Sequence, residues 1–502
     1  MREKPENHGN VTAELIEGKL YKHSVSFKYA LFSVLLFFGC LLTGTLAFGA
    51  SLELMFLLLW ILVSLLVMRL GYKYNEAQSM AWEMGKQSFE PNTIILVVGV
   101  MIATWMASGT IPYVIYWGLE MISPQYFLIT ALILASATSL ATGTSWGTLG
   151  TVGLALMAVG NALGVPAPMA AGAIICGAFF GDKMSPLSDS TILASSISGA
   201  KVMTHVKHML WTTVPAYVIT AVIFLFLGLK YGKEAMNLQQ IQEITSILTK
   251  NFDLSWIQLI PLVIVLALLI KGIPSIVSLL MGVFSGLIVA VLNQGYDLSE
   301  VFNMMTNGFV IESGSELVDT ILSRGGLFSL MSSFLVVYLA MCVTGMLEGS
   351  GILSALVEPL VKRTEGSIFK ITLATMFIAL ITNAIGSSML LTAIVTGSLM
   401  RTVFTKNNLA PENLSRNIED VGTIGAPIIP WNSNAIYASQ MLGVSPFAFF
   451  PYVYLAFITP IFDIIYAATG FTMKKLKSEN IDDSETTLKM EKELFLRESK
   501  EV

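Results

Sequence analysis

The stretch Gly181-Asp-Lys-Met-Ser-Pro-Leu-Ser-Asp-Ser-Thr191 places charged, hydroxyl-bearing and proline residues inside a long apolar region. Between Glu90 and Lys201, the only charged residue outside this stretch is Glu120. An ionisable side chain at the centre of a membrane helix costs about 2.5–3.5 kcal/mol, so such residues persist mainly where they bind something. The stretch therefore predicts a polar binding site within a membrane-embedded part of the chain.

The rest of the chain is much more apolar than a soluble protein. Of its 502 residues, 54% are hydrophobic and 13% are charged, and the mean hydropathy is +0.71, whereas soluble domains carry about 25% charged residues. Apolar runs recur that reach the roughly 18 residues of a membrane-crossing helix. They lack the polar–apolar alternation of membrane β-strands. We predict an all-α polytopic membrane protein.

The same kind of interruption occurs again in the second half of the chain. Gly425-Ala-Pro-Ile-Ile-Pro-Trp-Asn-Ser-Asn-Ala435 matches the first stretch at an offset of 244 residues. Upstream of each lies a small, hydroxyl-rich break, Thr142-Gly-Thr-Ser-Trp-Gly-Thr148 in the first half and Thr382-Asn-Ala-Ile-Gly-Ser-Ser388 in the second. Paired, interrupted apolar segments of this kind indicate the binding site of a secondary transporter. Lipid cannot satisfy the freed backbone groups, so the breaks should line a hydrated cavity.

The positive charges indicate how the chain is oriented. Lysines and arginines gather before residue 29 and after residue 471, and such residues favour the cytoplasmic side. We therefore expect both termini in the cytoplasm and an even number of crossings. The predicted segments are a cytoplasmic N-terminal tail (1–26), an N-terminal helix pair with a polar loop (27–91), transport repeat 1 (92–229), a linker with middle helices (230–326), transport repeat 2 (327–475) and a charged cytoplasmic C-terminal tail (476–502).

The residues of the breaks suit a hard cation, which prefers carboxylate, hydroxyl, amide and carbonyl oxygens. A buried carboxylate that holds either a cation or a proton would exchange one for the other. We place a candidate Na+ site at Asp182, Asp189 and Asn432. Since the second repeat has no carboxylate at the matching positions, the charge should come mainly from the first. The candidate ion- or substrate-binding residues are Asp182, Asp189, Ser188, Ser190, Thr142, Thr144, Ser145, Thr148, Asn383, Ser387, Ser388, Asn432 and Asn434.

Several of these residues also have a purely structural explanation. Serine and threonine hydroxyls in helices often bond the carbonyl four residues earlier, and an acid at a helix start can act as a cap. Glu419 and Asp420 fit a binding role and the solvated end of a loop equally well. His205 and His208 are expected in a solvated polar loop.

The interrupted stretches resemble the Na+/H+ antiporters of the NhaC family. The motifs that carry the resemblance are Thr144-Ser-Trp-Gly-Thr148, Gly181-Asp-Lys-Met-Ser-Pro-Leu-Ser-Asp189, Leu414-Ser-Arg-Asn-Ile-Glu-Asp420, Pro430-Trp-Asn432 and Thr469-Gly-Phe-Thr472. The resemblance implies a bacterial plasma-membrane antiporter with two inverted repeats whose discontinuous helices and hairpins meet at mid-membrane. Members of the family exchange Na+ for protons, or malate for Na+ and lactate. The chain departs from the family pattern at Ser190-Thr191 and at Ser433-Asn434-Ala435.

We therefore predict a secondary antiporter that exchanges Na+ for H+, with an organic-anion antiporter of the malate/lactate type as the alternative. The chain has neither a His-Glu-x-x-His motif nor a phosphate-binding Gly-x-x-x-x-Gly-Lys-Ser/Thr loop, which argues against an enzyme. A channel is a further possible class. The internal repeat, with carboxylates in only one of its halves, favours a carrier over a channel. No cofactor is expected, with Na+ as a transported ion. The expected partners are Na+, H+, small organic anions and the lipid bilayer, without nucleic acid, and a homodimer is compatible with the sequence.

Overall fold

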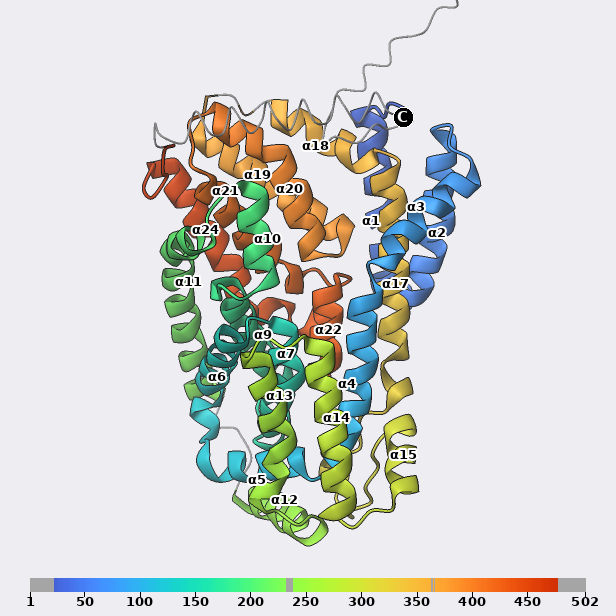
Figure 1. Cartoon of the computed structure of the whole chain (residues 1–502), viewed down its shortest axis with the longest axis vertical. Helices are drawn as coiled ribbons and strands as arrows, with labels where there is room; N and C mark the ends of the chain where they lie inside the picture. Colours follow the sequence, from blue (N-terminus) through green and yellow to red (C-terminus); the bar gives the residue numbers. More distant parts are fainter. Residues whose placement is uncertain (1–21, 232–237, 363, 365, 477–502) are drawn as a thin grey trace, which may run out of the picture.

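The computed structural model describes residues 22–231, 238–362, 364 and 366–476, and these residues fold as a bundle of helices (Figure 1). Eight helices are long and apolar enough to cross a bilayer, or up to ten spans if each of two bent helix pairs counts as one. The prediction of an all-α polytopic protein is confirmed. Most of the two predicted tails, residues 1–21 and 477–502, lies outside the described residues.

The helices follow one another with short connections. Their bounds are α1 Phe27–Leu42, α2 Leu52–Arg69, α3 Tyr74–Lys86, α4 Phe89–Ala107, α5 Thr110–Met121, α6 Phe127–Thr142, α7 Ser145–Thr148, α8 Leu154–Ala162, α9 Ala167–Met184, α10 Asp189–Ser198, α11 Val202–Tyr231, α12 Leu238–Asn251, α13 Ile260–Ile270, α14 Ser275–Leu292, α15 Leu298–Asn307, α16 Glu316–Leu322, α17 Met331–Gly349, α18 Ile352–Lys362, α19 Ile368–Gly386, α20 Met389–Lys406, α21 Pro411–Ile418, α22 Ser433–Leu442, α23 Pro446–Phe449 and α24 Tyr454–Thr469. A π-helical segment, η3 (Leu149–Gly153), joins α7 to α8, and another, η6 (Glu419–Thr423), follows α21.

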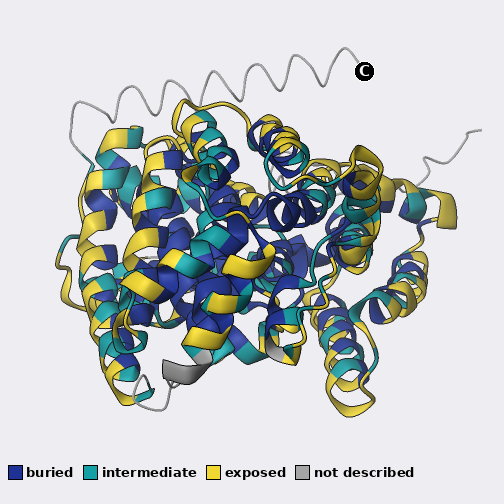
Figure 2. Cartoon of the chain, turned by 90° about the horizontal axis from the view of Figure 1, so that it is seen from below, coloured by how far each residue is buried: buried dark blue, intermediate teal, exposed yellow. Residues whose placement is uncertain are grey.

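The outer faces of the bundle are apolar. Figure 2 shows buried residues in the interior and exposed ones around the outside. Large apolar side chains such as Leu35, Ile61 and Phe226 are each more than 60% exposed. In water such a surface would drive association, whereas in a bilayer it faces lipid tails of similar polarity. The exposed apolar residues therefore fit a protein embedded in lipid.

The polar loop predicted to end the 27–91 segment contains a helix. Helix α3 is amphipathic and buries Ala77, Ala81 and Met84, and it packs against α17 and α2. Its small buried residues permit a close approach to α17. The polar composition that suggests a loop belongs to the opposite face of this helix.

The two halves of the chain share their element boundaries at the offset of 244 residues. Helices α6 and α19 end at Thr142 and Gly386, and helices α10 and α22 cover Asp189–Ser198 and Ser433–Leu442. The residues after α6 and α19, Gly143 and Ser387, both adopt the left-handed backbone conformation, with φ of 72° and 51°. In the structure Gly143 corresponds to Ser387. The alignment of Thr142 with Thr382 that the sequence suggested is therefore shifted by four residues.

A further pair of helices matches at the offset of 242 residues. Helices α4 and α17 are followed by Ser108-Gly109 and Ser350-Gly351, and both glycines have a positive φ. In Figure 1, α5, which follows α4, lies at the lower end of the molecule, and α18, which follows α17, lies at the upper end. Corresponding helices thus lead to opposite ends of the bundle.

Close packing of α6 on α9 fixes the position of the decisive stretch. A Cβ atom on Gly177 would come within 2.5 Å of the Leu132 carbonyl oxygen, and one on Gly181 within 2.5 Å of Ser139 Cβ. Glycine at both positions lets the two backbones touch. This contact holds Asp182, one residue after Gly181, beside the break at Gly143.

Candidate functional site

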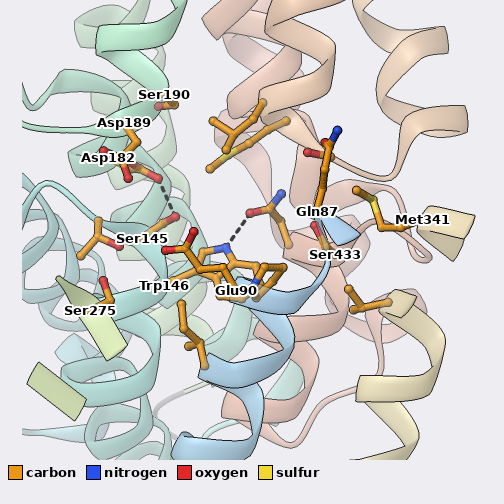
Figure 3. Close-up of a pocket in the computed structure, with 18 of the residues that line it drawn as sticks. Gln87, Glu90, Ser145, Trp146, Asp182, Asp189, Ser190, Ser275, Met341 and Ser433 are labelled. Atoms are coloured by element: carbon orange, nitrogen blue, oxygen red, sulfur yellow. Dashed lines mark hydrogen bonds between the residues drawn. The ribbon is translucent and has the colours of Figure 1, made fainter. Parts of the chain in front are cut away.

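A cavity of about 240 Å³ lies where the helix breaks of the two halves meet (Figure 3). Its walls come from the C-terminal ends of α3 and α9, from α17, and from the starts of α4, α7, α10, α14, α20 and α22. The lining residues are Gln87, Glu90, Pro91, Ile94, Gly143, Thr144, Ser145, Trp146, Asp182, Asp189, Ser190, Ser275, Val337, Met341, Ser388, Met389, Leu390, Ser433 and Asn434. Segments far apart in the chain thus build one polar chamber.

Asp182 is the most strongly engaged carboxylate of the cavity. Its side chain is 3% exposed. Ser145 Oγ donates to Asp182 Oδ2 at 2.6 Å, as Figure 3 shows, and Ser188 Oγ donates to Oδ1. Each carboxylate oxygen thus has a hydroxyl donor, which stabilises the ionised form. The same hydroxyl oxygens have free lone pairs to offer a cation once their protons turn away.

The break between α9 and α10 is held by side-chain hydrogen bonds. Thr191 Oγ1 donates to the backbone oxygens of Asp182 (3.2 Å) and Lys183 (2.9 Å), two carbonyls at the end of α9 that lack helical partners. Ser188 and Ser190 hydroxyls lie 3.1 Å apart. Asp189 begins α10, is exposed and lines the cavity. The short connection therefore brings both predicted carboxylates to one cavity.

The second half contributes a chain of amides. Asn432 Nδ2 donates to Asn383 Oδ1 (2.8 Å), and Asn434 Nδ2 donates to Asn432 Oδ1 (3.0 Å). Across the cavity, Trp146 Nε1 donates to Asn434 Oδ1 at 2.8 Å. The Trp146 indole stacks on Tyr437, with ring centroids 4.1 Å apart. Trp146 of the first half is thus bonded and stacked to the second half at the cavity wall.

Four helices present their N-terminal ends to the cavity. Thr144, Ser188, Ser388 and Asn432 are the N-cap residues of α7, α10, α20 and α22. The backbone N–H groups at a helix start carry a partial positive charge and favour anionic groups. The carboxylates of Glu90, Asp182 and Asp189 also line this cavity. Carboxylates and helix starts in one cavity suit the binding of a cation together with an anion.

A second buried group of charges lies behind the cavity. Lys183 Nζ bonds Asp420 Oδ1, and Arg416 Nε donates to Asp463 Oδ1 at 2.8 Å, with all four side chains fully buried. These residues come from α9, from α21 with η6, and from α24. Because Lys183 is occupied by Asp420, its charge points away from the cavity. Among the charged residues that line the cavity, all described ones are acidic, namely Glu90, Asp182 and Asp189.

One expectation near this group is wrong, and one of two open alternatives is excluded. His205 and His208 lie on α11 and are buried, rather than in a solvated loop. His205 Nδ1 bonds the Ser415 hydroxyl at 2.7 Å, and His208 Nε2 lies 3.0 Å from Arg416 Nη1. Glu419 and Asp420 are likewise fully buried, which excludes the explanation that they solvate the end of a loop.

The structure brings most of the predicted site residues together. Thr144, Ser145, Asp182, Asp189, Ser190, Ser388 and Asn434 line the cavity. Ser188 and Asn432 lie behind them in direct hydrogen-bond contact, and Asn383 lies one step further back, bonded to Asn432. The Ser387 carbonyl accepts from Ser433 N at 3.0 Å. Thr142 and Thr148 are outside the lining, where their hydroxyls bond the carbonyls of Thr138 and Thr144. Asn432 reaches the cavity only through Asn434.

Other cavity residues escaped the sequence reading. Trp146 lies inside the Thr144-Ser-Trp-Gly-Thr148 motif, but nothing in the sequence indicates its hydrogen bond to Asn434. Gln87 follows α3, Glu90 lies in the first turn of α4, and Ser275 begins α14. Nothing local marks them, because only the packing of α4 and α14 brings them to the breaks. No set of three His, Cys, Asp or Glu side chains able to hold a metal occurs in the described parts of the chain.

Repeated, broken helices around a polar chamber inside a membrane bundle define a secondary transporter. Residues 177–471, more than half of the chain, match the family model described as "Na+/H+ antiporter family". The chain is 39% identical over 444 residues to the malate-2H(+)/Na(+)-lactate antiporter of Bacillus subtilis (strain 168), covering 88% of this chain and 95% of the relative. It is 36% identical over 414 residues to the Na(+)/H(+) antiporter NhaC of Alkalihalophilus pseudofirmus, covering 82% and 88%.

A third relative is the arginine/ornithine antiporter ArcD of Halobacterium salinarum, which is 36% identical over 382 residues, or 76% of this chain and 79% of the relative. The chain therefore belongs to the Na+/H+ antiporter family, as its motifs indicated. It is a multi-pass membrane transporter and not an enzyme. The three relatives are named for different solutes, so membership of the family does not identify the solute that this protein transports.

Proposed function

We propose that this protein exchanges Na+ for H+ across the bacterial plasma membrane, with Asp182 as the carboxylate that holds either ion. The observation that carries the proposal is the acidic lining of the cavity, in which Asp182 accepts hydrogen bonds from Ser145 and Ser188. A cation would take carboxylate and hydroxyl oxygens as ligands, with Asp189 and Ser190 beside them. A proton on Asp182 would remove the negative charge and expel the cation.

Alternating access would follow from two inverted repeats. The proposal is supported by the common offset of 244 residues and by the placement of α5 and α18 at opposite ends of the molecule in Figure 1. In this scheme the two halves rock about the cavity, where Trp146 bonds Asn434. With the positive-inside bias, both termini lie in the cytoplasm.

The experiment is transport by the purified protein in liposomes loaded with a pH-sensitive dye. An inward Na+ gradient should raise the internal pH, because Na+ enters as H+ leaves. Li+ and K+ gradients measure cation selectivity. An internal pH that does not respond to any of these gradients, with malate and lactate absent, would contradict Na+/H+ exchange.

A second candidate is an organic-anion antiporter that also couples to Na+ and H+. The favouring observation is the convergence of four helix N-termini on the cavity, since they suit the carboxylate of an organic solute. The name of the Bacillus relative, with malate and lactate, points the same way. Liposomes loaded with lactate should then take up labelled malate, and lactate-free liposomes should not. If Na+ and H+ move only when malate and lactate are present, organic-anion exchange is the primary function.

A further inference from the structure

Glu419 is a buried carboxyl that the cavity does not use. It opens η6, a π-helical turn between α21 and the second break. Its side chain is fully buried, and neither carboxyl oxygen has a hydrogen-bond partner among the described residues. π-helical turns inside helices often occur at functional sites. An unpartnered carboxyl in such a turn therefore calls for an explanation.

The charges around Glu419 are already paired with one another. On α9, Lys183 pairs with Asp420, and on α24, Asp463 pairs with Arg416 of α21. Asp182, also on α9, is held by two serine hydroxyls. The contact between α9 and η6 brings Asp182 and Lys183 to the same side of the bundle as Glu419. Lys183 is thus the ammonium group that the described part of α9 places beside the carboxyls of Glu419 and Asp420.

The remaining elements that pack against η6 are α19, α20, α10 and the short 3-10 segment η7 (Ala426–Ile428), which carries no charged residue. Helix α19 meets it through Asn383, whose amide donates to the Gly422 carbonyl at 2.7 Å, and α20 meets it through Thr392. Helix α10 carries one acid, Asp189, which lines the cavity. The charged residues of α19 and α20, which are Lys370, Arg401 and Lys406, lie nine or more positions along their helices from these contacts. No further cation in the described residues is thus available on these helices to pair with an ionised Glu419.

A buried carboxylate without a partner costs several kcal/mol and is avoided by taking up a proton. The two ion pairs, Lys183 with Asp420 and Arg416 with Asp463, are each balanced, so an ionised Glu419 would add a buried negative charge with no cation of its own. In this conformation Glu419 is therefore the neutral acid. Its proton is stored close to Asp182 but outside the cavity lining.

We infer that Glu419 is a second proton-carrying carboxyl of the exchange, besides Asp182. The inference rests on the proposed function. When a cation binds at Asp182, its positive charge favours the loss of the Glu419 proton to water in the cavity. Glu419 is then a carboxylate that shares Lys183 with Asp420. Departure of the cation reverses the step, and Glu419 takes its proton back from water.

The test counts the protons released when Na+ binds to the purified, lightly buffered protein in detergent. The variants are Glu419→Gln, which keeps the shape of the neutral acid, and Glu412→Gln as a control. Glu412 lies on the same α21–η6 segment, is 15% exposed and sits 4.0 Å from Lys474. We expect Glu419→Gln to release one proton fewer per chain than the wild type, and Glu412→Gln to match it. An unchanged count in Glu419→Gln would overturn the inference.

Infrared spectroscopy gives a second readout that does not need a Glu419→Gln protein. The carbonyl stretch of a protonated carboxyl should be present in Asp182→Asn and should shift in Glu419→Asp. Absence of the band from Asp182→Asn would also overturn the inference. The two proposals fail differently. If Na+ releases no protons from the wild type, the proposed exchange fails, whereas a normal release that Glu419→Gln leaves intact removes only the role of Glu419.

Discussion

Removal of the Ser145 hydroxyl should move the pH dependence of transport upward. In the structure Ser145 Oγ donates to Asp182 Oδ2 at 2.6 Å, and both side chains are buried. A hydrogen bond to a charged group contributes about 1.5–3 kcal/mol. Ser145→Ala removes this contribution from the ionised carboxylate but leaves the neutral acid almost unaffected. A difference of this size corresponds to about 1–2 pH units.

The sign follows from which form of Asp182 loses stability. Without the Ser145 donor the carboxylate is less stable, so a proton binds more readily and competes better with Na+. The pH at which half of the maximal Na+-driven exchange is reached should therefore rise. Below that pH the variant should stay protonated and inactive. The Na+ concentration for half-maximal rate should also rise, because a hydroxyl ligand is lost.

The assay is Na+-driven pH change in proteoliposomes, measured across a range of external pH. Ser145→Thr keeps a hydroxyl and should stay near the wild-type profile. Ser139→Ala is the matched control, because this buried hydroxyl donates to the Ala178 carbonyl at 2.5 Å and not to Asp182. A Ser145→Ala profile that coincides with that of Ser139→Ala would refute the reasoning.

Three further outcomes follow from the packing around the site. Lys183→Met should lower the stability to thermal unfolding by about 3–5 kcal/mol, since it leaves the buried Asp420 without a cation and with only the Thr212 hydroxyl as a donor. Lys183→Met with Asp420→Leu should recover most of this loss, and an unaltered melting temperature in the single variant would contradict the pairing. Gly181→Ala should destabilise by about 1–3 kcal/mol through overpacking against α6, whereas Gly39→Ala, with nothing within 4 Å of its Cβ, should not. Asn432→Ala should raise the Na+ concentration for half-maximal rate, because Asn434 loses the amide that orients it; an unchanged concentration would make Asn432 a packing residue.

The sequence was informative wherever the chemistry is local. The acids of the first break, the hydroxyls beside them and the repeat offset can all be recognised along the chain, because a charge in an apolar run is costly and therefore conspicuous. The register of the Gly143 break was misjudged. Its counterpart, Ser387, adopts a left-handed backbone that is usual for glycine, so the residue type gave no indication of the turn.

The partners of buried charges could not be predicted in the same way. Lys183 and Asp420 are 237 positions apart, and only the contact of α9 with η6 joins them. Trp146 belongs to a recognisable motif, yet its hydrogen bond to Asn434 spans 288 positions. Thr142 and Thr148, in contrast, bond carbonyls one turn away, which is the structural alternative that the sequence reading had already weighed.

The most direct measurement of the central claim is Na+-driven proton movement by Asp182→Asn in proteoliposomes. Asp189→Asn is measured beside it, and Asp297→Asn serves as the control, because Asp297 is the N-cap of α15 and asparagine caps a helix equally well. The account predicts that Asp182→Asn abolishes the exchange, that Asp189→Asn weakens it, and that Asp297→Asn retains it. Full exchange with an unchanged pH profile in Asp182→Asn would contradict the carboxylate mechanism.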